Sequence, residues 1–367
     1  MKKIIVLGAG MVGSTIASDL SKNYEVVVCD INKERLNEIS SGIRVKILQA
    51  DLSDKNNLKD IVKDSDIIVG AVPGFMGFET LKTIIEAGKN VVDISFFDED
   101  PFRLDELAKQ NNVTAIVDCG VAPGLSNIIL GYHSERLKID SFECYVGGLP
   151  FERKPPFEYK APFSPSDVIE EYTRPARIMI NCKVEIKEAL SEPELIETEA
   201  GTLEAFNTDG LRSLLKTMKI MNMKEKTLRY PGHIHLMKVL RESGFFNKEQ
   251  IEIKGKMISP IDVTSKLLFP LWKLDKNEKE FTVLKIKIAG EGKIIEYSMF
   301  DKFDEETKTS SMARTTGYTC TAAVNLVLNG DYSKKGISPP EYIGKDENCF
   351  NKVLDYLDER RIKIKRL

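Results

Sequence analysis

Residues 3–30 decide the fold of this chain, and they read KIIVLGAGMVGSTIASDLSKNYEVVVCD. The apolar run of residues 3–7 leads directly into a glycine-rich segment, and an amphipathic stretch follows. A second apolar run, residues 26–29, ends at Asp30. A glycine-rich turn between a strand and a helix, followed by a strand that ends in an acid, predicts a βαβ unit that binds a dinucleotide.

Each glycine of this segment has a distinct expected task. Gly8 permits the tight turn, Gly10 lets a pyrophosphate approach the backbone, and Gly13 lets the helix pack closely on the strand. The free amide groups of the first helical turn, which begins with Met11 and Val12, are expected to face the phosphates together with the positive end of the helix dipole.

The acid at the end of the second strand indicates which dinucleotide binds. Asp30 lies 20 residues after Gly10 (30 − 10), where a carboxylate accepts hydrogen bonds from the ribose hydroxyls and repels a 2′-phosphate. NAD is therefore the expected cofactor. Arg35 is the opposing signal, because it is close enough in sequence to meet a 2′-phosphate if the loop bends toward it.

Short apolar runs recur after this unit, with helical patterns between them. They occupy residues 45–48, 67–72, 90–94 and 114–117. This alternation predicts an α/β fold with a doubly wound parallel sheet of the Rossmann type over residues 1–125, completed by about 310–367. Ligand contacts in such a sheet lie at the carboxyl ends of the strands, which here hold Asp51, Leu52, Val72, Pro73, Asp93 and Ser95.

The pattern changes after residue 125. Strand-like runs appear at residues 142–146, 178–186, 281–288 and 294–300. The last two are separated by a short glycine-containing segment, residues 289–293, which is typical of an antiparallel hairpin. Residues 126–309 are therefore expected to form a second α/β domain with a mainly antiparallel sheet.

The charge of the chain excludes some classes of partner. Lysine and arginine number 53 against 56 for aspartate and glutamate, and the net charge of −3 gives no electrostatic reason to bind nucleic acid or an anionic membrane. The basic residues 360–366 are expected to be a solvated helix end or a short terminal strand. No apolar segment approaches the ~18 residues of a membrane span, and none resembles a signal peptide.

Six cysteines are scattered along the chain without a CxxC pair or a cluster with histidine. This distribution indicates neither a zinc site nor a redox pair, so no metal is expected. A reducing, cytoplasmic location fits such cysteines.

Three segments of the second domain are dense in arginine, carboxylates, Gly and Pro, beyond what helices and strands require. They are residues 170–177, 208–212 and 228–233. Arginine binds a carboxylate with a planar fork and a carboxylate binds an ammonium, so together the segments predict a pocket for a zwitterion. The competing interpretation is structural, with Arg174 paired with Glu171 and Arg229 with Glu225.

Two side chains of the second domain are candidate general bases. His233 follows a Pro-Gly turn, and imidazole titrates near neutrality. Lys160 lies beside Tyr159 in a segment broken by prolines, where burial would lower the pKa of its ammonium. The alternatives are a histidine without a catalytic role and an exposed lysine.

Over nearly its whole length the sequence resembles the saccharopine dehydrogenase-like superfamily, and within it the L-lysine 6-dehydrogenases of bacteria and archaea. The motifs that carry the resemblance are GFMGF at 74–78, VAPGLSN at 121–127, YVGGLP at 145–150, EYTRPA at 171–176, NTDGLR at 207–212 and TLRYPGH at 227–233. The resemblance implies a Rossmann domain completed by C-terminal elements, NAD as oxidant, and a second α/β domain with the substrate pocket and a dimer interface.

Two departures distinguish reactions within the superfamily. Saccharopine reductases generally carry an Asp before the Pro-Gly of the second motif and a Cys before Gly-Gly-Leu-Pro. This chain has Ala122 and Val146 at those positions. Apolar groups at both positions argue against a saccharopine reductase.

The resemblance therefore implies NAD-dependent oxidative deamination of the ε-amino group of L-lysine to 2-aminoadipate 6-semialdehyde, which cyclises to 1-piperideine-6-carboxylate. Arg174 or Arg212 is expected to bind the α-carboxylate and Asp209 the α-ammonium. The full expected substrate set is Tyr172, Arg174, Asp209, Arg212 and Arg229. The expected base is one of Lys160, His233 and Asp93. Because only the neutral amine can release a hydride, activity is expected to rise toward alkaline pH.

Two other functions remain open at this point. One is an imine reductase of the saccharopine or carboxynorspermidine type, which needs room for a second substrate. The other is a non-catalytic NAD sensor, since the first ~60 residues also resemble the NAD-binding domains that regulate potassium channels. Such regulatory domains usually end after one Rossmann unit, whereas a second domain of ordinary size follows here.

Overall fold

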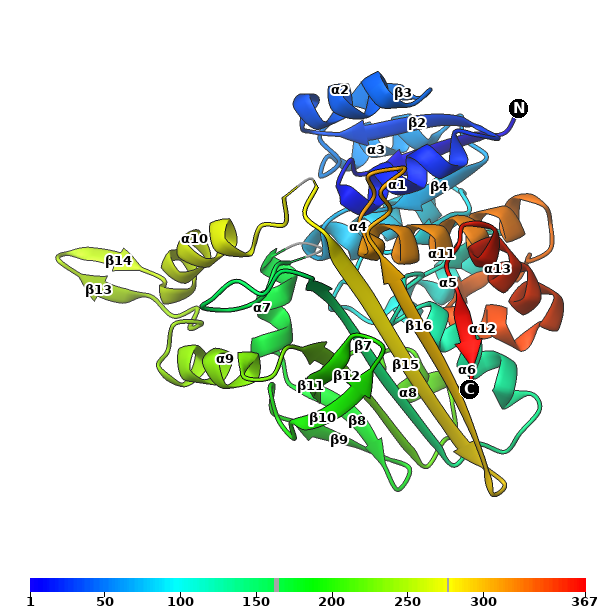
Figure 1. Cartoon of the computed structure of the whole chain (residues 1–367). Helices are drawn as coiled ribbons and strands as arrows, with labels where there is room; N and C mark the ends of the chain where they lie inside the picture. Colours follow the sequence, from blue (N-terminus) through cyan, green and yellow to red (C-terminus); the bar gives the residue numbers. More distant parts are fainter. Residues whose placement is uncertain (162–164, 276) are drawn as a thin grey trace. The chain divides into compact units, whose positions relative to one another are not determined.

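The computed structural model describes residues 1–161, 165–275 and 277–367, and the side chains of residues 165 and 166 lie outside this description. The described part of the chain divides into two compact units. Unit 1 comprises Met1–Leu137 and Ala313–Ile362, and unit 2 comprises Lys138–Met312 and Lys363–Leu367 (Figure 1). Each unit is built around its own sheet.

Unit 1 contains the parallel sheet that the alternating apolar runs predict. Its order is β17-β6-β5-β4-β1-β2-β3. The strands are β1 (Lys3–Leu7), β2 (Glu25–Asp30), β3 (Lys46–Gln49), β4 (Ile67–Gly70), β5 (Val91–Asp93), β6 (Thr114–Ile116) and β17 (Gly336–Ser338). Because the strand order reverses between β1 and β4, the point where a doubly wound sheet binds its ligand lies at the carboxyl ends of these two strands.

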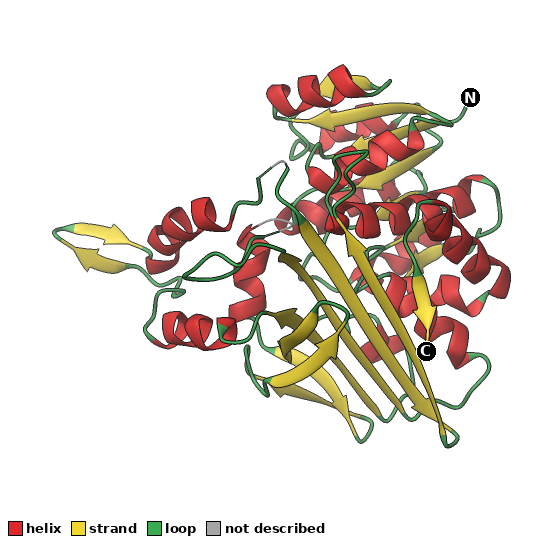
Figure 2. Cartoon of the chain, viewed as in Figure 1, coloured by secondary structure: helices red, strands yellow, loops and turns green. Residues whose placement is uncertain are grey.

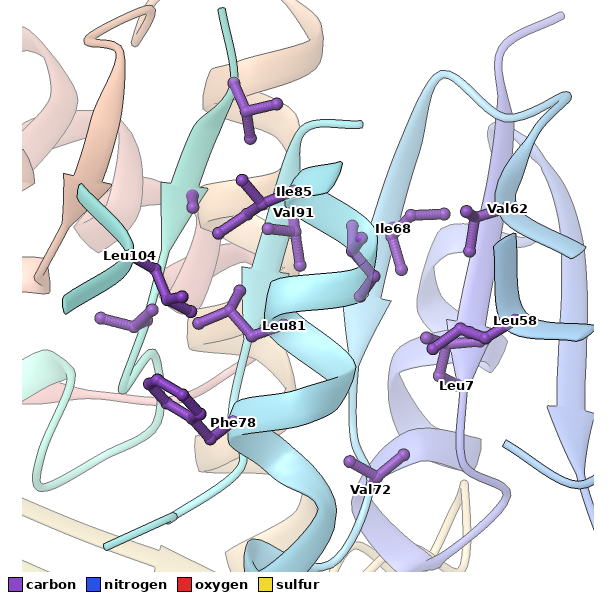
Figure 3. Close-up of a cluster of buried hydrophobic side chains, with 14 of the residues drawn as sticks. Leu7, Leu58, Val62, Ile68, Val72, Phe78, Leu81, Ile85, Val91 and Leu104 are labelled. Atoms are coloured by element: carbon purple, nitrogen blue, oxygen red, sulfur yellow. The ribbon is translucent and has the colours of Figure 1, made fainter. Parts of the chain in front are cut away.

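The helices of unit 1 are amphipathic or apolar segments between these strands. They are α1 (Met11–Leu20), α2 (Lys33–Gly42), α3 (Lys55–Val62), α4 (Gly74–Glu86), α5 (Asp105–Gln110), α6 (Leu125–Ser134), α12 (Pro340–Lys345), α13 (Glu347–Glu359) and most of α11 (Ser311–Leu328), with the short 3-10 helix η1 (Pro101–Leu104) before α5. Figure 3 shows Phe78, Leu81 and Ile85 projecting from α4 into the buried cluster that also holds Ile68 and Val91.

The N-terminal part of α4 packs closely because it contains glycines. A Cβ atom on Gly74 would lie 2.5 Å from the carbonyl oxygen of Phe96, and one on Gly77 would lie 2.6 Å from the ring of Phe97. With a larger residue at either position, the backbone of α4 could not approach Phe96 and Phe97 so closely. The GFMGF segment is therefore explained by packing against the chain that follows β5.

One buried carboxylate ties the first helix of unit 1 to its last helices. Asp19 of α1 accepts hydrogen bonds from the hydroxyl of Thr321 (2.9 Å), the hydroxyl of Tyr356 (2.7 Å) and Nε of Arg360 (2.9 Å). Burial alone would raise the pKa of Asp19, but Arg360 and Tyr356 more than offset it, and the pKa is lowered. The carboxylate therefore stays charged and holds α1, α11 and α13 together.

Helix α6 also packs within unit 1. A Cβ atom on Gly131 would lie 2.1 Å from the carbonyl oxygen of Glu341, and one on Gly344 of α12 would lie 1.9 Å from that of Ile128. The two helices cross at glycine contacts. Residues up to Leu137, which include a stretch expected in the second domain, consequently belong to unit 1.

Unit 2 contains a mixed, mainly antiparallel sheet, which confirms the predicted fold class. Its order is β10-β11-β12-β7-β15-β16-β18, with β8 beside β12 and β9 beside β8. Only the pairing of β12 with β7 is parallel among the described ladders of this sheet. The strands are β7 (Ser141–Pro150), β8 (Ala176–Ile180), β9 (Lys183–Lys187), β10 (Glu194–Thr198), β11 (Gly201–Asn207), β12 (Asn222–Arg229), β15 (Glu280–Gly290), β16 (Lys293–Lys302) and β18 (Ile364–Arg366).

The predicted hairpin in this sheet is present. Strands β15 and β16, the long adjacent arrows in Figure 2, are joined at Glu291 and Gly292, which have φ values of 50° and 72°. Two consecutive positive φ angles are those of a tight hairpin turn. Within the basic residues 360–366, the last three form β18, which pairs with β16. Of the two structures expected for this segment, the short terminal strand is therefore confirmed.

Other expectations about unit 2 need correction. Residues 178–186 form two strands rather than one, because Asn181 and Cys182 adopt φ values of 49° and 63° and turn the chain back. The charged segment around residue 170 is the end of α7 (Pro165–Thr173), and residues 227–229 of another charged segment lie in β12. Charge density alone therefore did not mark loops here.

The remaining elements of unit 2 surround an aromatic core. They are α8 (Leu214–Thr217), α9 (His233–Glu242), the hairpin of β13 (Ile251–Ile253) and β14 (Lys256–Ile258), and α10 (Pro260–Trp272). Tyr159, Tyr172, Phe206 and Trp272 are buried in this core. No described helix of either unit is at once long and apolar enough to cross a bilayer.

Candidate functional site

The glycine loop of unit 1 connects β1 to α1. Gly8 has a φ of +114°, and a Cβ atom on it would lie 2.3 Å from the carbonyl oxygen of Ala71. A Cβ atom on Gly13 would lie 2.2 Å from the carbonyl oxygen of Gly8. These two glycines are therefore needed for the loop to close on the strands.

Gly10 has a different environment. A Cβ atom on it would meet no described atom within 4 Å, so the space beside the loop is open. Gly10 is the N-cap of α1 and offers no side chain to the helix. The amide groups at Met11 and Val12 can then donate to an anion, and the loop fits the pyrophosphate of a dinucleotide.

Asp30, at the end of β2, holds the loop in place. Its Oδ2 accepts a hydrogen bond from the amide of Ala9 (2.7 Å), and its Oδ1 accepts one from the amide of Asn32 (2.7 Å). Each oxygen has a further lone pair, so the carboxylate can also accept from ribose hydroxyls. Arg35 is exposed in the first turn of α2, where its amide is capped by Asn32.

Two predicted contacts follow β3. Asp51 is exposed, and it accepts hydrogen bonds from the hydroxyl (2.6 Å) and the amide (2.9 Å) of Ser53, which lower its pKa. Leu52 is buried. Asp51 can therefore reach a ligand, whereas Leu52 contributes to the core.

The turn after β4 carries Val72 and Pro73, and Pro73 is the N-cap of α4. Val72 is buried. Phe75, one residue into the helix, is 90 % exposed, which is unusual for a phenylalanine. Phe75 lies directly after a Pro-Gly turn at the carboxyl end of a strand.

Asp93 and Ser95 form a buried pair at the end of β5. The carboxylate of Asp93 accepts from the amide of Ser95 (2.8 Å) and from its hydroxyl (3.2 Å). Asp93 is fully buried. A carboxylate oxygen of Asp93 would lie 1.9 Å from a Cβ atom on Gly70, so the side chain packs directly on β4.

Arg229, at the end of β12, is 1 % exposed and is surrounded by acceptors. Its Nε donates to the hydroxyl of Tyr172 (3.2 Å), and Nη1 donates to the carbonyl oxygen of Leu228 (3.0 Å). Nη2 donates to Glu171 (2.5 Å) and to the hydroxyl of Tyr159 (3.3 Å). Burial alone would lower the pKa of Arg229, but these tyrosines and Glu171 outweigh it, so the pKa is raised and the cation is retained.

The ion pairs differ from the structural alternative considered for these arginines. Arg229 pairs with Glu171 rather than with Glu225, and Arg174 pairs with Glu170 one helical turn away (3.6 Å). Glu225 and Arg229 both lie on β12, where four residues span about 13 Å. The two side chains are therefore too far apart along the strand to pair.

His233, the first residue of α9, is also buried. Its Nδ1 lies 2.9 Å from the carbonyl oxygen of Phe157, and its Nε2 lies 2.9 Å from the hydroxyl of Tyr172. Since a carbonyl only accepts, Nδ1 carries the hydrogen and Nε2 accepts from Tyr172. Burial, and then Arg229, lower the pKa of His233 to about 3. A neutral ring with both nitrogens engaged suits positioning of Tyr172 better than proton abstraction near neutrality.

Asp209 is occupied by a neighbour. Its two oxygens accept from Nε and Nη2 of Arg177 (2.8 Å each), and the amide of Arg177 adds a third bond (3.0 Å). This fork is the arrangement of a structural pair. Arg212 is 9 % exposed and adopts a φ of 43°, and the side chain of Arg174 is 20 % exposed.

Lys160 is held within unit 2. Its Nζ donates to the carbonyl oxygen of Lys273 (3.0 Å) and lies 3.7 Å from a carboxylate oxygen of Glu278. The side chain is 17 % exposed. Lys160 is thus neither an exposed lysine nor an isolated buried ammonium.

Trp272 was missed by sequence reasoning. It is fully buried, and its ring centroid lies 5.8 Å from that of Tyr159 and 6.0 Å from that of Tyr172. The signal was slight, because it consisted only of the chain having a single tryptophan. Tyr159, Glu171, Tyr172, Arg229 and His233, with Trp272 packed on them, are called the Arg229 cluster below.

The chain matches two family models. Residues 4–116 match the model described as saccharopine dehydrogenase NADP binding domain, and residues 120–362 match the saccharopine dehydrogenase C-terminal domain. The solved apo histidine-tagged saccharopine dehydrogenase (L-Glu forming) from Saccharomyces cerevisiae superposes with a TM-score of 0.79 at 18 % identity over 100 % of both chains. That likeness shows the shared fold.

Curated relatives match part of their own length. An alpha-aminoadipic semialdehyde synthase of Arabidopsis thaliana is 27 % identical over 262 residues, which are 66 % of this chain and 25 % of the relative. A saccharopine dehydrogenase [NADP(+), L-glutamate-forming] of Pyricularia oryzae is 25 % identical over 284 residues, which are 73 % of this chain and 63 % of the relative. With family models matching residues 4–116 and 120–362, the chain belongs to the saccharopine dehydrogenase family, and its N-terminal part is a pyridine-nucleotide-binding domain.

Proposed function

We propose that this protein is an NAD-dependent dehydrogenase that oxidises the ε-amino group of L-lysine. The reaction consumes lysine, NAD and water and yields 2-aminoadipate 6-semialdehyde, ammonia and NADH, with release of a proton. The semialdehyde then cyclises to 1-piperideine-6-carboxylate. A cytoplasmic location is part of the same proposal.

The observation that carries this proposal is the pair of alkyl groups at Ala122 and Val146. Val146 lies within β7 and is in register with Thr227 of β12 and Leu284 of β15. Ala122 precedes Pro123 in the turn after β6. Neither side chain can exchange a proton or hold a second polar substrate, in contrast to the Asp and Cys of the saccharopine reductases that the motifs resemble.

The nucleotide is assigned to unit 1. The amides of the glycine loop would hold the pyrophosphate, and Asp30 would accept from the ribose hydroxyls while disfavouring a 2′-phosphate. Asp51, Val72, Pro73 and Ser95 would line the same strand ends. When bound, the nicotinamide accepts the hydride released from C6 of lysine.

The substrate carboxylate is assigned to Arg174, with Arg212 as the alternative. Arg174 is partly exposed, and its guanidinium presents the planar fork of donors that suits a carboxylate. Arg229 and Tyr172 have their hydrogen-bonding groups engaged inside the Arg229 cluster and are assigned to shaping the pocket wall. Asp209 is not carried forward as the ammonium site, since Arg177 occupies both of its oxygens.

The proton of the ε-ammonium must leave before the hydride, because a protonated nitrogen has no lone pair to share. Asp93 and Lys160 remain the candidate bases. His233 is excluded from this proposal by its low pKa and its engaged nitrogens. Turnover should increase with pH as the neutral amine becomes more abundant.

A second candidate is the activity named for the fungal relatives, cleavage of saccharopine to L-glutamate with NADP. It is favoured by the match of residues 4–116 to an NADP-binding model and by the curated relative from Pyricularia oryzae reported above. Arg35, exposed near the ribose end of the site, would serve a 2′-phosphate in this case.

The deciding experiment is a cofactor-reduction assay at mildly alkaline pH. Purified protein is given L-lysine or saccharopine, each with NAD or NADP, and the reduced nucleotide, ammonia and glutamate are measured. Reduction of NAD with lysine, with one ammonia per NADH and without 2-oxoglutarate, supports the proposal. Glutamate release from saccharopine with NADP establishes the second candidate, and the absence of any turnover contradicts both.

A variant pair tests the carboxylate site. Arg174→Ala should raise the KM for lysine about 10- to 100-fold with little change in kcat, because a charge-assisted contact of about 1.5–3 kcal/mol is lost. Arg177→Ala is the matched control, since that arginine serves Asp209, and its KM should stay within about threefold. An unchanged KM in Arg174→Ala would move the assignment to Arg212.

A further inference from the structure

A cavity of about 490 Å³ lies at one edge of the parallel sheet of unit 1. It is lined by Tyr332, Lys334, Tyr342, Lys345 and Asp346. These residues come from the chain just before the edge strand β17, from α12, and from the N-cap of α13 (Figure 1). In the sheet order, β1 with its glycine loop lies four strands away from β17. The cavity is therefore separate from the nucleotide site, and its volume is within the range of small-molecule sites.

The walls of this cavity are fixed by the interior of unit 1. Tyr332 is 7 % exposed, and its hydroxyl donates to the hydroxyl oxygen of Ser338 (2.9 Å). Helix α12, which carries Tyr342 and Lys345, is held against α6 by the close glycine contacts described above. Because both walls are already in place, a ligand does not have to order them, and this lowers the entropy cost of binding.

Two ammonium groups converge on one aromatic ring of the cavity. The Nζ atom of Lys334 lies 3.6 Å from the ring centroid of Tyr342, and the Nζ atom of Lys345 lies 5.8 Å from the same centroid. Desolvation of the Lys334 ammonium, and then the charge of Lys345, lower the pKa of Lys334. Negative charge bound beside the two lysines would offset their repulsion.

The two lysines differ in their partners. Lys345 has a carboxylate oxygen of Glu135 at 3.5 Å, and the two side chains are 37 % and 49 % exposed. An ion pair so exposed contributes little free energy, so a ligand can displace Glu135. None of the carboxylates in residues 1–161, 165–275 and 277–367 forms an ion pair with Lys334. The cavity therefore offers two positions for a negative group of a ligand.

Asp346 adds one negative charge to the same lining. Its Oδ1 accepts a hydrogen bond from the amide of Cys349 (2.9 Å) and so caps α13. The residue is exposed, and a carboxylate has lone pairs for several donors, so Asp346 can also accept from an ammonium group. The same charge would repel a ligand that is only an anion.

We propose that this cavity binds a dicarboxylic α-amino acid of the kind of L-glutamate. Its two carboxylates would lie beside the ammonium groups of Lys334 and Lys345, and its ammonium group would donate to Asp346. Its methylene groups would contact the tyrosine rings. Two positive groups and one negative group of the lining are complementary to two carboxylates and one ammonium. The site is additional to the one in which the proposed reaction takes place.

Calorimetric titration of the full-length chain with L-glutamate tests the proposal. The wild type should bind glutamate, and Lys334→Ala should weaken that binding at least ~10-fold with an unchanged circular dichroism spectrum, because a charge-assisted contact is lost. Lys335→Ala is the matched control, because Lys335 is the next residue in the chain and does not line the cavity, and its affinity should stay within about twofold of the wild type. A wild type that does not bind glutamate, or a Lys334→Ala variant with unchanged affinity, overturns the proposal.

Ligand analogues test which groups are recognised. Glutarate lacks the ammonium group and should bind the wild type at least ~10-fold more weakly than glutamate. Asp346→Asn keeps an acceptor oxygen for the amide of Cys349 and should bind the two ligands about equally. Equal affinities of glutamate and glutarate for the wild type, or tighter binding of inorganic phosphate than of glutamate, would identify a plain anion site and overturn the proposal. These titrations need no turnover of lysine, so a failure of the proposed reaction would not affect them.

Discussion

The glycine loop of unit 1 and the Arg229 cluster of unit 2 are both regions that sequence reasoning marked for binding, but they use their polar groups in opposite ways. The loop leaves an open space beside Gly10. In the Arg229 cluster, the guanidinium of Arg229 donates hydrogen bonds to four acceptors of the same unit. A ligand site is thus marked by open space and available donors, whereas the charged side chains of a charge-rich segment can pair with one another.

The largest expected effect is on the stability of the Arg229 cluster. Arg229→Met should lower the free energy of unfolding of unit 2 by about 3–5 kcal/mol, because Glu171 would lose its partner inside the protein. Urea unfolding followed by the fluorescence of Trp272, which is the chain's one tryptophan and lies in the cluster, measures this directly. Arg177→Met should cost no more than about 1 kcal/mol, because its guanidinium is partly exposed. Equal losses of unfolding free energy in both variants would contradict the assignment of Arg229 to a buried, stabilising ion pair.

The glycine loop is tested by a substitution that adds one methyl group. Gly10→Ala should leave the thermal midpoint unchanged, since its Cβ meets no described atom, yet weaken NAD binding about 10- to 100-fold by displacing the pyrophosphate from the amides. Calorimetric titration measures the affinity. Gly42→Ala, at the end of α2 and equally unobstructed among the described atoms, should bind NAD normally. Normal binding by Gly10→Ala would mean that the space serves no ligand.

The stability of the Arg229 cluster should also depend on pH. The pKa of His233 is lowered to about 3, whereas an unfolded chain has a histidine pKa near 6.5, so between those values the unfolded state binds a proton that the folded state does not. Stability therefore falls as pH falls from 6.5 toward 3, by up to about 1.4 kcal/mol per pH unit. His233→Gln should flatten this part of the curve of unfolding free energy against pH. A slope equal to that of the wild type would show that folding does not change the pKa of His233.

The smallest expected effect concerns the choice of nucleotide. Asp30→Asn keeps one acceptor oxygen, which can serve the amide of Ala9 or of Asn32 but not both, and it removes the charge, so NAD should bind about threefold to tenfold more weakly and NADP should gain relative to NAD. Fluorescence titration with both nucleotides measures the ratio. If instead Arg35→Ala weakens NADP strongly and Asp30→Asn changes nothing, the site is built for NADP.

Much of the fold was readable from the sequence because it depends on local patterns. Apolar runs of period two or of buried type placed β1 to β6 within a few residues, and the segment 289–293 placed the β15–β16 hairpin. The turn at Asn181 and Cys182 was missed, since neither residue is a glycine and the positive φ angles are imposed by the surrounding sheet.

The candidate site was less predictable for a different reason. Sequence reasoning selected residue types that can bind a substrate, but which partner each one has is decided by long-range pairing. Arg229 meets Glu171 and Asp209 meets Arg177 only after β12, α7 and β8 have come together. The glycine loop was predictable because strand, turn and helix are consecutive in the chain.

The bond network around Asp19 has a consequence for biosynthesis. Its partners lie 302, 337 and 341 residues further along the chain. At about 5–20 residues per second, translation delivers them on the order of 15–60 s after Asp19 itself. The nucleotide-binding unit therefore receives the partners of Asp19 only after residues 138–312 of unit 2 have been synthesised, and until then the carboxylate of Asp19 and the helix that carries it lack these contacts.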